Sequence, residues 1–223
     1  MNEHKREVSM KRFLFLFVGL VLILTACGQS EAVDSTKLHT YKQYKLPLED
    51  KVAFGEGEHE IVFVFDYSCP WCKKWMEEVL PEIEERWIET GEATFKGQPL
   101  VLLNEQSQLL ANVDYNVERL VPDRYYEIQR AIGLDSGSDG FGTEAYAREL
   151  AAEFNLDADE LMENHVDIGI QNSRLFTRDF GVQYVPTVYV DGIQLVDAFS
   201  LEEMEHVMDG TVQAGDKVEV RED

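Results

Sequence analysis

Two of the three cysteines are separated by only two residues, in the segment Cys69-Pro70-Trp71-Cys72. A thiolate attacks disulfides as a nucleophile, and a second thiol nearby can displace the mixed disulfide that results. Thiolate pKa values in such motifs lie between about 3.5 and 7.5, against about 8.5 for a free cysteine. The spacing therefore predicts dithiol–disulfide exchange, with Cys69 as the attacking thiol and Cys72 as the resolving thiol.

The residues on either side predict where this pair lies. Residues 60–67 form a short apolar run typical of a buried strand, and from Pro70 onward the apolar residues recur with helical spacing. The first N–H groups of a helix lack intrahelical partners, and the helix dipole adds about half a positive charge there. We therefore expect a lowered pKa for Cys69, with Pro70 suited to the first helical turn.

Two other uses of a close cysteine pair are less favourable. A structural disulfide across so short a loop restricts the unfolded chain little, so it would add little stability. A tetrahedral zinc site requires two further ligands, and the five histidines show no paired metal spacing. We therefore expect no metal and no cofactor beyond the redox-active disulfide Cys69–Cys72.

The remaining pattern predicts an α/β domain. Helical spacing without strand signals extends from about residue 105 to 180, and a capping box at Ser200 predicts a last helix. The helix after Pro70 is expected to kink at Pro81. This order predicts a mixed sheet with flanking helices and an all-helical insertion. The expected strands lie at residues 41–46, 60–67, 94–103, 186–190 and 193–196, with Asp191-Gly192 as the hairpin turn between the last two.

Two segments carry a resemblance to a known family. Asp66-Tyr67-Ser68-Cys69-Pro70-Trp71-Cys72 resembles the active-site motif of the DsbA-like branch of the thioredoxin superfamily. Gly181-Val182-Gln183-Tyr184-Val185-Pro186-Thr187 resembles the approach to the cis-proline of that family. The resemblance covers about residues 40–210, and it implies the thioredoxin fold with a helical insertion.

The resemblance also implies roles for individual residues. Pro186 is expected to follow a cis peptide bond, which would place the Val185 backbone beside Cys69 to pair with an extended client peptide. The alternative is an ordinary trans proline that opens an edge strand. Trp71 is expected to shield the sulfurs or to form an apolar docking surface; otherwise it is simply a solvent-exposed aromatic.

One position departs from the family pattern. Many relatives carry a buried acid six positions before the first cysteine, where this chain has Phe63. Asp66 lies three positions before Cys69 and, by strand alternation, faces away from Phe63. Three interpretations stay open: Asp66 accepts the proton of Cys72, water does so, or Asp66 only caps the helix or lines the turn.

The N-terminal segment is predicted to be a lipoprotein signal peptide at residues 1–26. Basic residues precede an apolar run at 13–24 that is short for a membrane span but suits a signal. Leu24-Thr25-Ala26-Cys27 resembles the bacterial lipobox, in which the peptide is cut before a cysteine that then carries lipid such as palmitate. The alternative is an ordinary secretory signal with a chance cysteine. A flexible tether is expected at 27–39 and the thioredoxin-like domain at 40–215.

The composition narrows the function further. A formal net charge of −23 repels nucleic acid, so we expect no nucleic-acid binding. The expected protein is an extracytoplasmic, lipid-anchored thiol–disulfide oxidoreductase that donates disulfides to secreted or membrane clients and is regenerated by a membrane redox partner. The alternatives are a disulfide reductase or isomerase, for example for apocytochromes, and a non-catalytic binding lipoprotein. Pro70-Trp71 does not decide between them.

Overall fold

The computed structural model describes residues 36–221, so the predicted signal peptide and Cys27 lie outside the described residues. Residues 38–218 form one compact unit. Strands β1 (Thr36–Thr40) and β6 (Lys217–Arg221) pair in a two-stranded sheet of their own. None of the helices between residues 36 and 221 has the length and apolar composition needed to cross a membrane.

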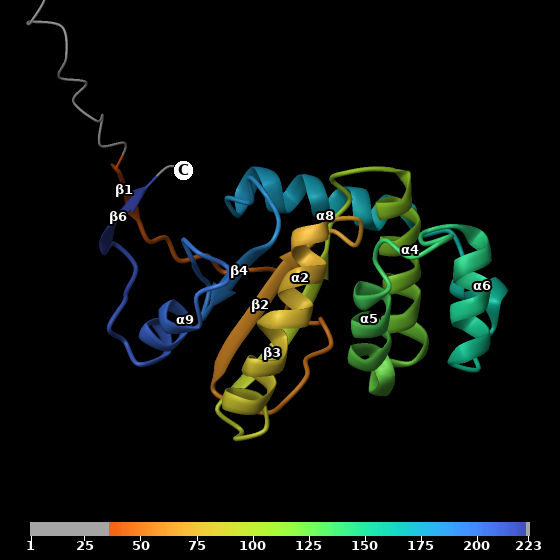
Figure 1. The fold of residues 1–223 in the computed structure, drawn as a ribbon, viewed down its shortest axis with the longest axis horizontal. Helices are drawn as coiled ribbons and strands as arrows, with labels where there is room; N and C mark the ends of the chain where they lie inside the picture. The colour runs from red at the N-terminus through yellow and green to blue at the C-terminus, as the bar shows by residue number, and fades with distance from the viewer. Residues whose placement is uncertain (1–35, 222–223) are drawn as a thin grey trace, which may run out of the picture. The chain divides into compact units, whose positions relative to one another are not determined.

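The main sheet is mixed and has four strands in the order β3-β2-β4-β5 (Figure 1). Strand β2 (His59–Phe65) lies at its centre, parallel to β3 (Ala93–Pro99) and antiparallel to β4 (Thr187–Val190). Strand β5 (Ile193–Gln194) completes one edge, antiparallel to β4. The expected mixed sheet is therefore confirmed.

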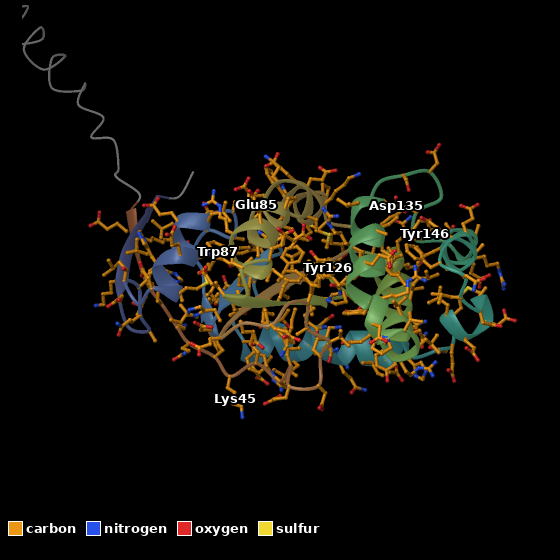
Figure 2. The ribbon with its side chains drawn as sticks, turned by 90° about the horizontal axis from the view of Figure 1, so that it is seen from below. Lys45, Glu85, Trp87, Tyr126, Asp135 and Tyr146 are labelled. Carbon is orange, nitrogen blue, oxygen red and sulfur yellow. The ribbon has the colours of Figure 1, made fainter. Side chains whose placement is uncertain are left out.

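Both faces of β2 are covered, which explains its uninterrupted apolar sequence. Phe63 and Phe65 pack with residues of helix α2 (Pro70–Glu78), whereas Val64 packs with Phe176 of helix α8 (Val166–Asp179). Figure 2 shows these two helices on opposite sides of the sheet. This packing fixes the direction in which the chain leaves β2 and enters the cysteine motif.

The active-site helix is interrupted where Pro81 was expected to disturb it. Helix α2 ends at Glu78, helix α3 (Leu80–Ile83) carries Pro81 in its first turn, and the π-helix η1 (Glu84–Ile88) follows. Trp75 anchors α2, because its ring stacks on Phe63 at 3.9 Å and its Nε1 donates to the carbonyl oxygen of Ala198 at 2.7 Å. The start of α2 is thus held firmly against the sheet.

The predicted helical block lies between β3 and β4, as expected. Asn104 opens it with a complete capping box, and Asp157 caps a short helix of four residues. The described helices of the block are α4 (Glu105–Leu120), η2 (Pro122–Arg124), α5 (Tyr125–Leu134), α6 (Glu144–Glu153), α7 (Ala158–Leu161) and α8.

Three strand predictions need correction. The strand expected at residues 94–103 ends at Pro99, and the N–H groups of Leu102 and Leu103 bond to the carboxylate of Asp66 instead of a neighbouring strand. Residues 41–46 form no strand; within them Gln43 makes only an isolated bridge to Ile193. Strand β5 stops at Gln194 rather than Val196, because the carboxylate of Glu203 takes the Val196 N–H at 2.7 Å and so draws it away from the ladder.

The end of the chain follows the prediction in part. Asp191 and Gly192 have φ values of 50° and 77°, the positive values that a tight hairpin turn needs. Ser200 caps helix α9 (Leu201–Met208) by accepting from the Glu203 N–H. Only this half of the capping box forms, since the Glu203 side chain is bonded elsewhere.

Candidate active site

Cys69 occupies the N-cap of α2, in the short connection between the end of β2 and the helix. Its carbonyl oxygen accepts the N–H groups of Cys72 at 3.0 Å and Lys73 at 3.2 Å, and Pro70 lies in the first turn. Cys69 is 6% exposed and Cys72 is 2% exposed, and both thiols are free. The structure therefore shows the reduced pair, with the first sulfur nearer to solvent than the second.

The two thiols have opposite electrostatic environments. The pKa of Cys69 is lowered to about 6, chiefly by a hydrogen bond from the Cys72 thiol and further by the backbone N–H groups of Cys72 and Trp71, while burial opposes the shift. The pKa of Cys72 is raised far above its usual value, chiefly by burial and then by its bond to Cys69. The lowered pKa expected for Cys69 is confirmed, with the neighbouring thiol as an added cause.

Alkylation of the reduced protein by iodoacetamide should report this thiolate directly. The reactive form of Cys69 disappears as pH falls through about 6, so we expect a half-maximal rate near pH 6 and a plateau above pH 7. Cys72 should contribute little, because it is buried and stays protonated. Free glutathione, measured alongside, should have its midpoint more than two pH units higher, near the ordinary cysteine value of about 8.5. A protein midpoint near that value would contradict the assignment.

The loop before β4 lies against Cys69. The Val185–Pro186 peptide bond is cis, as the resemblance predicted. The carbonyl oxygen of Val185 is 3.6 Å from the Sγ of Cys69, within reach of a thiol donor. The placement of the Val185 backbone beside Cys69 is therefore confirmed, while its pairing with a client peptide stays a prediction.

Asp66 is fully buried and its carboxylate is surrounded by donors. One oxygen, Oδ1, accepts from the Ser68 N–H at 2.8 Å and the Ser107 hydroxyl at 2.6 Å. The other, Oδ2, accepts from the N–H groups of Leu102 and Leu103 at 2.8 and 3.1 Å. Of the interpretations left open, the lining of the turn is the one this geometry matches.

Trp71 is exposed on the outer side of the motif. It is 60% exposed, its ring meets that of Phe199 edge to face at 6.3 Å, and Lys74 Nζ lies 5.2 Å from its centroid. Tyr184, next to Val185, is 59% exposed. The sequence alone did not assign Phe199 or Tyr184 to the site. Tyr184 lies two positions before Pro186, and Phe199 lies directly before the helix cap Ser200, so the available signal was an aromatic residue next to each landmark.

A cavity of about 320 Å³ adjoins the start of α2. Lys73 spans one side of it, donating from Nζ to the Ser136 carbonyl oxygen at 2.8 Å, and the Ser136 hydroxyl donates to the Tyr67 carbonyl oxygen at 2.7 Å. The loop at 135–140 therefore braces the cysteine motif. Among residues 36–221, no three His, Cys, Asp or Glu side chains gather as a metal site.

Comparison with known proteins agrees with this fold. A family model described as thioredoxin matches residues 53–210. BdbD from Bacillus subtilis in its oxidised form is similar with a TM-score of 0.69 and 18% identity, covering 77% of this chain and 98% of that one. No curated protein sequence matches this chain.

Two further solved structures share the fold. DsbA from Chlamydia trachomatis has a TM-score of 0.60 and 18% identity, covering 73% of this chain and 92% of its own. The alpha-DsbA1 protein from Wolbachia pipientis has a TM-score of 0.62 and 17% identity, covering 74% and 92%. At these identities the likeness concerns the fold: a mixed sheet with flanking helices and a helical insertion.

Proposed function

The chain belongs to the thioredoxin family, and on that premise we propose that it is a dithiol–disulfide oxidoreductase that donates disulfides to client proteins. One observation carries the proposal. The Cys69 sulfur has a pKa of about 6 at the start of a helix, beside a buried thiol that remains protonated. This asymmetry suits one attacked sulfur and one resolving sulfur. The names of the similar structures, among them DsbA, support the same class of chemistry.

The exchange balances with these two sulfurs alone. A client thiolate attacks the Sγ of Cys69 in the oxidised pair, the Cys69–Cys72 bond breaks, and Cys72 leaves with the electron pair and takes up a proton. The second client thiolate then attacks the client sulfur of the mixed disulfide and releases Cys69 as a thiolate. Two electrons pass from the client to the pair, and the client gains a disulfide.

The electrostatics favour donation. Cys69 leaves readily in the second step because a thiol of lower pKa is the better leaving group. Stabilising the Cys69 thiolate stabilises the reduced pair, so the disulfide becomes more oxidising. Reduction or isomerisation of particular clients, for example apocytochromes, is the alternative within this class. A non-catalytic binding lipoprotein would have no use for a thiol so activated.

We place the protein outside the cytoplasmic membrane, held there by lipid on Cys27. The support is the sequence of residues 1–27, with a basic segment, a short apolar run and the lipobox-like Leu24-Thr25-Ala26-Cys27. Its clients would then be secreted or membrane proteins with cysteines, and a membrane redox partner would reoxidise the pair.

In cells fed labelled palmitate, the wild-type protein should become labelled and the Cys27→Ala variant should not. Equal labelling of the two proteins would rule out this anchor.

The activity is tested by mixing the oxidised protein with a reduced, unfolded client. We expect each molecule of protein to remove two client thiols in a single turnover, and the reduced protein to remove none. Loss of thiols at the same rate with either form would overturn the proposed function.

A further inference from the structure

We propose that Asp66 is a positioning residue whose buried carboxylate holds the active-site turn and sets the balance between dithiol and disulfide, and that it takes no proton from Cys72. The inference deepens the proposed function and rests on it, since it concerns the same sulfur pair. Of the three interpretations that the sequence leaves open, this one assigns Asp66 to the turn and not to proton transfer.

The hydrogen bonds around the Asp66 carboxylate favour its ionised form. Three of the four donors to the carboxylate are backbone N–H groups, those of Ser68, Leu102 and Leu103, which can only donate. The fourth is the Ser107 hydroxyl. A proton on Oδ2 would face two N–H donors. A proton on Oδ1 would require the Ser107 hydroxyl to turn its own proton to Asn104 Oδ1 or Ser68 Oγ, at 3.1 and 3.2 Å, in place of the short bond to Asp66. Protonation would therefore cost hydrogen bonds in a fully buried site.

The carboxylate also makes no direct hydrogen bond to the resolving sulfur in the part of the chain that the structure describes. Among the described residues, no hydrogen bond joins the Asp66 side chain to Cys69 or Cys72; it is the Asp66 backbone that bonds to the Cys72 sulfur. A general base must lie within hydrogen-bond reach of the proton it removes, or reach it through one water. The Asp66 side chain is instead fully engaged with the turn.

The same four bonds join the elements that surround the cysteine motif. Asp66 follows β2, Ser68 precedes Cys69, Leu102 and Leu103 follow β3, and Ser107 lies in the first turn of α4. Because one side chain ties all of these together, the segment before Cys69 is held to both the sheet and the helical insertion. This is the positioning part of the role.

The negative charge of Asp66 affects the equilibrium between the dithiol and the disulfide. Burial and the bond to Cys69 are the larger causes of the raised Cys72 pKa, and the Asp66 anion adds to them. At Cys69 the bond from Cys72 lowers the pKa, and Asp66 acts in the opposite direction. The anion thus opposes the thiolate but not the uncharged disulfide, which restrains how strongly oxidising the pair becomes.

The test compares Asp66→Asn with two matched controls. The amide removes the charge at nearly the same size, so the alkylation midpoint of Cys69 should fall, by less than the shift that the larger causes produce. The equilibrium with glutathione should then shift toward the dithiol, with about 30 mV for each tenfold change. Ser107→Ala removes one donor but keeps the anion. Asp114→Asn removes another buried anion, bonded to Tyr67 and Tyr125. Both controls should lose stability yet keep the wild-type midpoint.

Three results would overturn the proposal. They are an unchanged or raised midpoint in Asp66→Asn, the same fall in Ser107→Ala, and a protonated Asp66 carboxyl signal in ¹³C NMR of the wild-type protein between pH 5 and 8 in either redox state. The NMR measurement decides the matter even if Asp66→Asn fails to fold. Failure of the proposed function is distinct, since it would show as absence of any glutathione exchange in the wild-type protein.

Discussion

Replacing Cys69 with serine is expected to reduce client oxidation to the uncatalysed rate. Cys69 is the thiol of the pair with the lowered pKa, and it is the one placed beside the cis-proline loop. A serine hydroxyl forms no disulfide, so neither the mixed disulfide nor its release can occur. The measurement is the rate of thiol loss from a reduced client mixed with the oxidised wild-type protein or with the variant.

The variant should remain folded, which makes its inactivity informative. The Cys69 side chain contacts the Val185 carbonyl oxygen and the Cys72 thiol, and the serine hydroxyl that replaces it is of similar size and can bond to both. Its urea unfolding midpoint should therefore stay close to that of the reduced wild-type protein. If Cys69→Ser oxidised the client at a rate near that of the wild-type protein, the assignment of Cys69 as the sulfur that reacts with the client would be wrong.

Replacing Cys72 with alanine is expected to trap the mixed disulfide with the client. Cys69 is still available to react with an activated client disulfide, but no buried thiol remains to displace the client. Nonreducing electrophoresis should show a covalent complex approaching one client per protein, which a reducing agent dissolves. The double variant Cys69→Ser with Cys72→Ala should form none.

The same variant tests the origin of the Cys69 electrostatics. The hydrogen bond from the Cys72 thiol is the largest cause of the lowered Cys69 pKa, so its loss should raise the alkylation midpoint above about 6. The backbone N–H groups at the helix start remain and should keep the midpoint below that of a free cysteine. If the midpoint instead stayed near 6, the helix start alone would be responsible.

Local patterns were sufficient to predict the core of the site. The apolar run of β2, the helical spacing after Pro70 and the break near Pro81 each depend on neighbouring residues, and all three appear in the structure. The cis bond before Pro186 came from the resemblance rather than from spacing, since a proline in a sequence allows either isomer.

The rest depended on contacts between distant residues. Asp66 and Ser107 are 41 positions apart, so only the fold shows that their side chains meet. The strand expected at residues 41–46 failed for a related reason. Tyr41 and Leu46 are both buried, although in a strand they would face opposite sides. The Tyr44 N–H is bonded to the Gly192 carbonyl oxygen in the hairpin turn and not to a continuous ladder.

The reduction potential of the Cys69–Cys72 pair, measured by equilibrating the domain with glutathione, tests disulfide donation most directly. Donation predicts a value in the range of protein disulfide isomerase and DsbA, between about −180 and −120 mV. A value near that of thioredoxin, about −270 mV, would contradict donation and identify a reductase instead.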